Sequence, residues 1–296
     1  MKKGKKVIEI MHEASPLQAC GLNKMYGKQT VLNGASLLVQ PGSIVGLVGR
    51  NGAGKSTFIE CLLGIQQVQS GQAQLFGKDP YSINDFDKSM LGYVPQRPDG
   101  FDWMTVEAML NLIAPLYPQW DHGLVARLLA QWKLNPSQRL LTMSPGERQQ
   151  VAIIRAIAPR PRLLVLDEPA SALDPYARRA LLREIVNLAS EDGCTVLFST
   201  HIISDLERIA THLALLHEGS IRLYGAVDDI KDTVRRLHWP ATVPLPSSAI
   251  AGELSRRQLE DGSYSLVLRG EEHCTLPSGL QTQALNLEDL FVELTA

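Results

Sequence analysis

Long apolar runs are missing from this sequence. No stretch of its 296 residues approaches the roughly 18 consecutive apolar residues that a membrane-spanning helix needs. The basic start, residues 1–6 (MKKGKK), is not followed by the apolar run and small-residue cleavage site of a signal peptide. We therefore expect a cytoplasmic protein that reaches a membrane only through a partner.

Cysteine is scarce, and neither sign of charge is in large excess. The four cysteines, Cys20, Cys61, Cys194 and Cys274, have no CxxC spacing, which argues against a disulfide framework and against a zinc site. We expect them to be reduced structural residues. A net charge of −2 gives no general attraction to polyanions, so we expect no nucleic acid partner.

Three short apolar runs read as buried strands within a chain whose 45% hydrophobic content can build a substantial core. They span residues 44–48, 162–169 and 194–201, and the second and third each follow a helical pattern. Alternating helices and continuous apolar strands predict an α/β fold with a mostly parallel sheet covered on both faces.

Two further regions differ from this pattern. Residues from about 99 to 141 have helical periodicity and hold three of the four tryptophans, which indicates a helical insertion. Residues 239–252 (WPATVPLPSSAIAG) are rich in Pro, Ala and Ser, which predicts a linker over 238–252. Beyond it, an Asp261-Gly262 turn between alternating residues and an N-cap at Asn286 predict a hairpin and a helix. We expect a small α+β accessory domain over 253–296.

The segment GRNGAGKST matches the phosphate-loop pattern G-x-x-x-x-G-K-[ST] and lies between a predicted strand and a predicted helix. Its glycines let backbone N–H groups close around phosphate oxygens at the positive end of the helix. Lys55 neutralises the β- and γ-phosphates of a nucleotide in this interpretation, and the Ser56 hydroxyl binds Mg²⁺. The predicted nucleotide-binding residues of the loop are Gly49, Arg50, Asn51, Gly52, Ala53, Gly54, Lys55, Ser56 and Thr57.

Two adjacent acids end the second predicted strand, in LLVLDEP. Asp167 is expected at the carboxyl edge of the sheet, beside the phosphate loop, where it serves the metal. Neighbouring residues at a strand end point in different directions, so Glu168 is expected to face the attacking water.

Six motifs, taken in their order along the chain, resemble the motif series of ATP-binding-cassette ATPases. They are the phosphate loop, YVPQ (93–96), MSPGERQQ, LLVLDEP, SALD (171–174) and STH (199–201). The resemblance covers residues 7–237. It implies a P-loop NTPase fold with a helical subdomain over about 99–160 and an antiparallel β subdomain. It also implies ATP with Mg²⁺ as cofactors and closure head-to-tail against a second cassette, in a homodimer or a heterodimer.

The resemblance carries further roles onto single residues. It implies that Tyr26 stacks on adenine, that Gln96 binds Mg²⁺ and relays motion to a partner, and that His201 holds the γ-phosphate. It places Asp174 at the opposite subunit's site. Glu168, Lys55 and His201 are thus the expected catalytic residues, and Ser56, Gln96 and Asp167 the expected metal ligands.

The segment MSPGE departs from the usual Leu-Ser-Gly-Gly-Gln signature at three positions, Met143, Pro145 and Glu147. It nevertheless reads as a capping box, with Ser144 as N-cap, Pro145 at N1 and Glu147 at N3. The family's γ-phosphate contacts come from the serine hydroxyl and the later glycine N–H, which survive as Ser144 and Gly146. We expect a working site unless the Glu147 carboxylate turns outward against ATP. Arg50 stands where many relatives carry proline, and we expect little consequence.

The leading functional hypothesis is the ATPase subunit of a membrane exporter, with the permease on a separate chain and the cassette on the inner face of the cytoplasmic membrane. The closing NLEDLFVEL resembles the C-terminal segment of bacterial exporter cassettes. Aromatic residues after Gln96 line a socket for the permease or form the insertion's own core; they are Phe101, Trp103, Tyr117 and Trp120. The alternative is a soluble cassette ATPase in cofactor assembly or another process without transport.

Overall fold

Six strands form the central sheet of a computed structural model that describes residues 15–98, 100–270 and 280–295. Their order is β5-β6-β7-β3-β8-β9, and all neighbours are parallel except β8 and β9. The strands are β3 (Ile44–Val48), β5 (Leu91–Val94), β6 (Leu163–Leu166), β7 (Thr195–Thr200), β8 (His212–His217) and β9 (Ser220–Ala226). Every residue of β3, β6 and β7 is buried, which explains their continuous apolar runs and confirms the predicted α/β fold.

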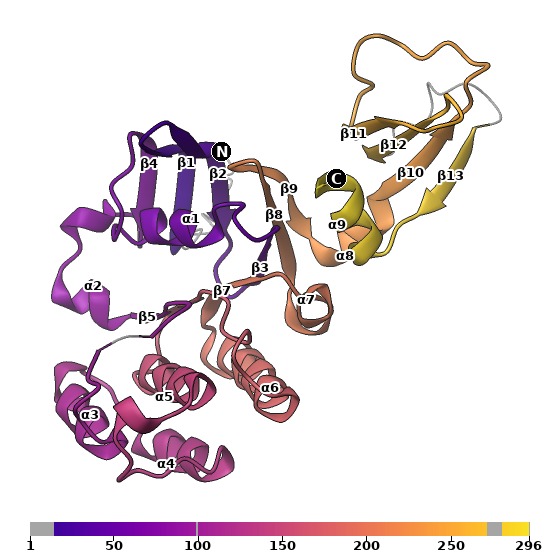
Figure 1. Cartoon of the computed structure of the whole chain (residues 1–296). Helices are drawn as coiled ribbons and strands as arrows, with labels where there is room; N and C mark the ends of the chain where they lie inside the picture. The colour runs from indigo at the N-terminus through magenta and orange to yellow at the C-terminus, as the bar shows by residue number, and fades with distance from the viewer. Residues whose placement is uncertain (1–14, 99, 271–279, 296) are drawn as a thin grey trace, which may run out of the picture.

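A three-stranded antiparallel sheet covers one side of this layer. It has the order β2-β1-β4 and consists of β1 (Leu17–Tyr26), β2 (Gln29–Val39) and β4 (Ser70–Leu75). Helix α1 (Lys55–Leu62) packs between the two sheets through Phe58 and Ile59, which are fully buried. The helix that follows β3 is therefore held from both sides (Figure 1).

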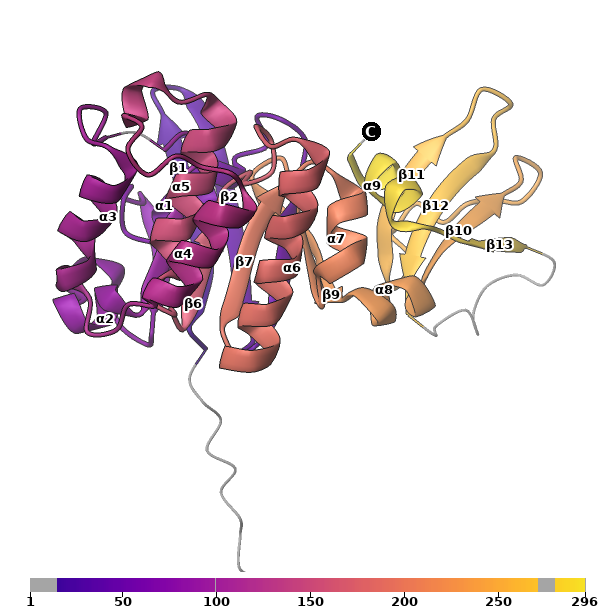
Figure 2. The ribbon, with the colours of Figure 1, turned by 90° about the horizontal axis from the view of Figure 1, so that it is seen from below.

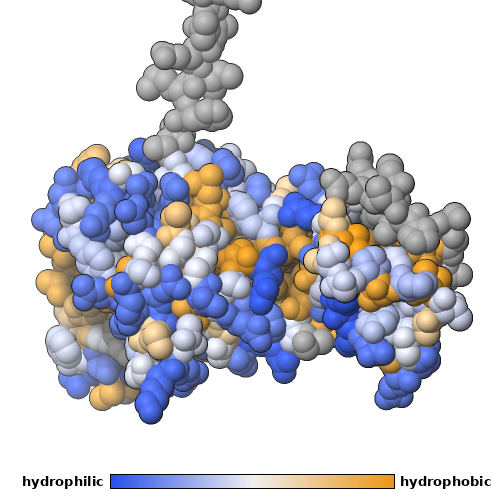
Figure 3. Space-filling model, turned by 90° about the horizontal axis from the view of Figure 1, so that it is seen from above, coloured by the Kyte–Doolittle hydropathy of each residue, from blue (hydrophilic) through white to orange (hydrophobic). Residues whose placement is uncertain are grey.

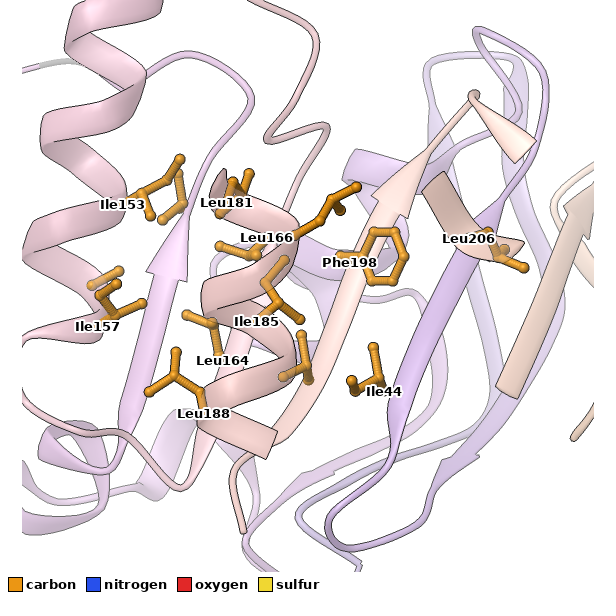
Figure 4. Close-up of a cluster of buried hydrophobic side chains, with 14 of the residues drawn as sticks. Ile44, Ile153, Ile157, Leu164, Leu166, Leu181, Ile185, Leu188, Phe198 and Leu206 are labelled. Atoms are coloured by element: carbon orange, nitrogen blue, oxygen red, sulfur yellow. The ribbon is translucent and has the colours of Figure 1, made fainter. Parts of the chain in front are cut away.

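Helices α5 (Pro145–Ile157), α6 (Pro175–Asp192) and α7 (Ile203–Ile209) lie along the other face of the central sheet (Figure 2). Ile153 and Ile157 of α5 meet leucines of β6, while Leu181 and Ile185 come from α6 (Figure 4). This packing holds the second half of α5 and strand β6 in one core.

The predicted helical insertion contains α3 (Val106–Ile113) and α4 (His122–Gln131), with single 3-10 turns at Ala114–Leu116 and Leu140–Thr142. A shorter helix, α2 (Asp85–Ser89), and a turn at Pro80–Ser82 precede it. Of its aromatic residues, Phe101, Tyr117 and Trp120 pack against the main core, whereas the side chain of Trp103 is largely exposed. Only the first three therefore match the expectation of an internal core.

The C-terminal region is a four-stranded antiparallel sheet of order β11-β12-β10-β13. It comprises β10 (Val234–Trp239), β11 (Glu253–Gln258), β12 (Tyr264–Arg269) and β13 (Gln281–Ala284), and helices α8 (Val227–Thr233) and α9 (Leu287–Thr295) flank it. The predicted hairpin is β11 with β12, and the Asn286 side chain accepts a hydrogen bond from the Asp289 N–H at 2.7 Å, as expected of an N-cap. Strand β10 begins at Val234, whereas residues 240–252 have no helix or strand. The division into domains remains a prediction.

Three of the four cysteines lie in the described part of the chain, and all three are free thiols. Burial raises the pKa of Cys61 to about 11 and that of Cys194 to about 12. Cys274 lies outside the described residues. No helix within the described ranges is long and apolar enough to cross a bilayer, and the surface seen in Figure 3 is hydrophilic over most of its area.

Candidate nucleotide site

The predicted phosphate loop lies between the end of β3 and the start of α1. Gly52 and Gly54 have φ values of +82° and +99°, which L side chains rarely adopt. A Cβ on Gly49 would lie 2.6 Å from the backbone oxygen of Leu216, so this position also requires glycine. The loop therefore brings backbone N–H groups to the start of a helix, which is a suitable place for an anion.

A cavity of about 340 Å³ opens at this loop. It brings together Lys55, Gln96, Glu168 and His201, which are far apart in the sequence. The remaining lining residues are Val31, Asn51, Gly52, Gly54, Ser56, Thr57 and Ser171. Most of the predicted loop residues thus line one space, whereas Asp167 does not.

Lys55 is buried at the base of this cavity. Its Nζ donates to the backbone oxygen of Gly49 at 2.8 Å and lies 3.0 Å from Glu168 Oε1, in an ion pair that lacks the angles of a hydrogen bond. The ammonium is thus held between the phosphate loop and the carboxylate that follows β6.

The two acids after β6 point in different directions, as the sequence predicts. Asp167 is buried and its Oδ1 accepts from the Ser199 hydroxyl at 2.6 Å, while Glu168 lines the cavity. The same Ser199 oxygen accepts from the Glu168 N–H at 2.8 Å. Glu168 has a φ of +48°, an uncommon conformation that costs on the order of 1–3 kcal/mol outside glycine.

His201 follows β7 and reaches the same carboxylate. Its Nδ1 lies 2.9 Å from Glu168 Oε2, and its ring lines the cavity with about 44% of the side chain exposed. Glu168 therefore has Lys55 at one oxygen and His201 at the other.

The Asp167 carboxylate adds negative charge to two neighbouring groups, on α1 and β5. Burial, and secondly the Asp167 carboxylate, raise the pKa of Glu60 on α1. Burial also raises the pKa of Tyr93, with Asp167 and Glu60 adding to the effect. A cation placed at this position would relieve that repulsion.

The predicted capping box at the start of α5 is confirmed. The Ser144 N–H donates to Glu147 Oε2 at 2.8 Å, and the Glu147 N–H donates to the Ser144 hydroxyl oxygen at 3.3 Å, with Pro145 at N1. The Glu147 carboxylate is thus turned back onto its own helix. Gly146 lies so close to the Ala172 carbonyl oxygen that a Cβ would stand 2.6 Å from it.

Residues 32–171 match the family model described as ABC transporter. The chain is 31% identical to a bacitracin transport ATP-binding protein of Bacillus licheniformis, over 74% of this chain and 72% of that protein. It is also 31% identical to a methionine import ATP-binding protein of Mesorhizobium japonicum, over 84% and 70%. A solved ATP-binding subunit of an ABC transporter superposes with a TM-score of 0.66 at 31% identity, over 73% of this chain and 92% of that one.

The chain belongs to the ATP-binding cassettes of ABC transporters. It is therefore an ATP-binding and ATP-hydrolysing subunit of a transporter, in agreement with the resemblance of its motifs. The three-stranded sheet and the helical insertion correspond to the expected subdomains of the cassette fold.

Five of the residues that the resemblance assigns outside the phosphate loop do not line the nucleotide cavity; they are Tyr26, Ser144, Gly146, Glu147 and Asp174. Tyr26 ends β1 about half exposed, with its ring centroid 5.1 Å from Lys24 Nζ. Asp174 caps α6 by accepting from the N–H groups of Tyr176 and Ala177 at 2.8 and 3.0 Å. Neither Ser144 nor Gly146 lines the cavity. A second cavity of about 500 Å³, lined by Gln96, Pro145 and Ser171 among others, adjoins it.

Sequence reasoning gave no role to Ser199, whose hydroxyl joins both acids of the cassette. A serine near the end of a buried strand, which needs a hydrogen-bond partner, is the signal that could have pointed to it. Val31 and Ser171, which line the cavity, carried no such signal in the sequence.

Proposed function

We propose that this cassette powers a membrane exporter and that Lys55, Glu168 and His201 are its catalytic residues. The observation that carries the catalytic assignment is the position of Glu168. Its two oxygens lie 3.0 Å from Lys55 Nζ and 2.9 Å from His201 Nδ1, at the wall of a cavity bounded by the phosphate loop. In this proposal Glu168 polarises the attacking water, Lys55 neutralises the β- and γ-phosphates, and His201 holds the γ-phosphate.

The donor set fits Mg²⁺ as a second cofactor. Ser56 and Gln96 offer a hydroxyl and an amide oxygen at the cavity, and the Asp167 carboxylate provides the negative field. These are hard oxygen ligands, and they are few, as Mg²⁺ requires when phosphates supply the others. The ion, when bound, neutralises charge on the phosphates.

A second cassette completes each site in this proposal. Ser144 is exposed and neither it nor Gly146 contributes to the chain's own cavity, so both are free to meet the γ-phosphate held by another copy. The Glu147 carboxylate accepts a hydrogen bond from the Ser144 N–H. In this proposal it therefore caps its own helix and does not point toward the ATP of the other cassette. Asp174 approaches the opposite site, and Tyr26 stacks on adenine.

A permease on a separate chain holds the pair of cassettes at the inner face of the cytoplasmic membrane. The exposed Trp103, with Leu116 and Leu141, offers apolar surface on the helical insertion for this contact. The export direction rests on the closing segment NLEDLFVEL and on the bacitracin transport relative. The methionine import relative has the same sequence identity to this chain as the bacitracin transport relative. The direction of transport is therefore the part of the proposal that most needs an experiment.

Two measurements test the proposal. The cassette is co-expressed with each membrane protein of neighbouring genes, and we expect one of them to co-purify from detergent-solubilised membranes. Recovery of the cassette only in soluble fractions, with every candidate membrane protein, would contradict the proposed permease on a separate chain. In proteoliposomes with outward-facing cassettes, ATP should drive substrate into the vesicle lumen for an exporter, whereas loss of preloaded substrate would show import.

A further inference from the structure

The phosphate loop touches the C-terminal helix. Arg50 Nη1 donates to the backbone oxygen of Thr295 in α9 at 3.2 Å, across 245 residues of sequence. We propose that Arg50 is a positioning residue through which docked α9 sets the phosphate loop, so that ATP affinity depends on the C-terminal region. This inference rests on the proposed role of the loop in binding ATP.

On the loop side, the contact continues to the catalytic groups. The backbone oxygen of Arg50 accepts from the Ala53 N–H at 3.0 Å and from Lys55 Nζ at 3.4 Å. The same Nζ lies 3.0 Å from Glu168 Oε1. A shift of Arg50 therefore moves an acceptor of the ammonium that is proposed to bind the phosphates.

On the helix side, α9 is anchored in the main core. Leu287, Leu290 and Leu294 are buried in the same cluster as α5 and β6, and the helix packs on α7 and β8. The final carbonyl groups of a helix carry partial negative charge, which attracts a guanidinium. Docking of α9 thus presents Arg50 with a favourable acceptor.

The same helix holds the C-terminal sheet. The buried Glu293 carboxylate accepts from Arg236 of β10 at 2.8 Å and lies 3.4 Å from Arg257 of β11. Figure 1 shows α9 between the sheet formed by these strands and the larger lobe. A molecule that binds the C-terminal sheet can therefore act on ATP binding through one helix.

The test measures the dissociation constant of MgATP with the full chain. Arg50→Ala and Leu290→Ala should each weaken binding by about tenfold. The double variant should bind MgATP no more weakly than either single variant, because both substitutions break the same contact between Arg50 and α9. Arg50→Lys keeps a donor and should restore part of the affinity. The matched controls are Arg208→Ala, an exposed arginine, and Val292→Ala on the exposed side of α9, and both should bind ATP normally.

ATP binding and α9 docking must affect each other to the same extent, so the docking of α9 can be measured as a second readout. A merely structural role of Arg50 would not change this readout. If docked α9 favours ATP, then MgATP should slow hydrogen exchange of the α9 amides, and this protection should be absent in Arg50→Ala. Glu293→Gln, which weakens the ion pairs without opening a cavity, replaces Leu290→Ala if that variant does not fold, and it should also weaken MgATP binding.

Lys55→Ala separates the two proposals. If Lys55→Ala binds ATP normally, the proposed site itself is wrong. If Lys55→Ala loses ATP while Arg50→Ala binds within twofold of the unaltered chain, the site stands and the role of α9 is overturned.

Discussion

His201 Nδ1 and Glu168 Oε2 lie 2.9 Å apart, although β7 separates the histidine from the acid that follows β6. The other carboxylate oxygen lies beside Lys55. The candidate base is therefore oriented from two sides by protein side chains.

Glu168→Gln should bind ATP and lose hydrolysis, by about 10²–10⁴-fold, because the amide cannot accept a proton from water. Steady-state phosphate release and gel filtration with ATP measure this, and a closed dimer should accumulate. Glu191→Gln, at an exposed position of α6, is the matched control and should hydrolyse ATP normally. Near-normal turnover in Glu168→Gln would remove Glu168 from the role of base.

Ser199→Ala should destabilise the protein by about 1–3 kcal/mol, because the buried Glu168 N–H and the Asp167 carboxylate both lose a partner. Denaturant unfolding gives the change in free energy, and ATP turnover should fall in the folded variant. Ser190→Ala on the exposed side of α6 should alter neither quantity. Equal stability of the two variants would contradict the proposed importance of Ser199.

Pro145→Gly should leave ATP turnover of the assembled complex within about tenfold of the unaltered protein, a change below about 1.4 kcal/mol in barrier. The reason is that Ser144 and Glu147 keep the capping box in either sequence. A gain of about a hundredfold or more would instead show that the natural signature is impaired.

Tyr26→Ala should weaken ATP binding by about 1–3 kcal/mol if the ring stacks on adenine, whereas Tyr26→Phe keeps the stacking face and should bind normally. Because the ring is about half exposed, thermal unfolding should change little in either variant. Equal affinity of both variants would exclude stacking by Tyr26.

Asp121→Asn should reduce stability at pH 7 but not in acid. The Leu124 N–H at the start of α4, and then Arg160, hold the pKa of Asp121 below its usual range. The depressed pKa means that the charged form stabilises the fold above the ordinary pKa, and that this stability is lost as pH falls through the lower folded value. Asparagine can still cap the helix, so the two proteins should converge in urea unfolding once the pH falls below the lowered pKa of Asp121 in the folded protein. A difference that does not change with pH would contradict a role for the charge.

Local patterns predicted the parts of this cassette that depend on neighbouring residues. The phosphate loop, the capping box from Ser144 to Glu147 and the buried strand before Asp167 each follow from a few consecutive side chains. The capping box in the structure confirms the prediction that Pro145 is compatible with a helix start.

Contacts between distant segments could not be predicted in the same way. Nothing beside Arg50 in the sequence indicates that its side chain meets Thr295, because that contact depends on how α9 returns to the larger lobe. Likewise, β10 joins the C-terminal sheet by pairing with β12 and β13, so its partners lie beyond the linker that the composition predicts.

The closeness of Gly146 to the Ala172 carbonyl limits which signature sequences this fold accepts. A proline at position 145 fits, because the N–H that it lacks has no acceptor within the helix at N1 and its ring fixes a φ that suits the first turn of α5. Any side chain at position 146 would push the SALD segment away from α5 and so alter the path that leads to Asp174. The signature of this fold therefore accepts proline at position 145, whereas position 146 requires glycine.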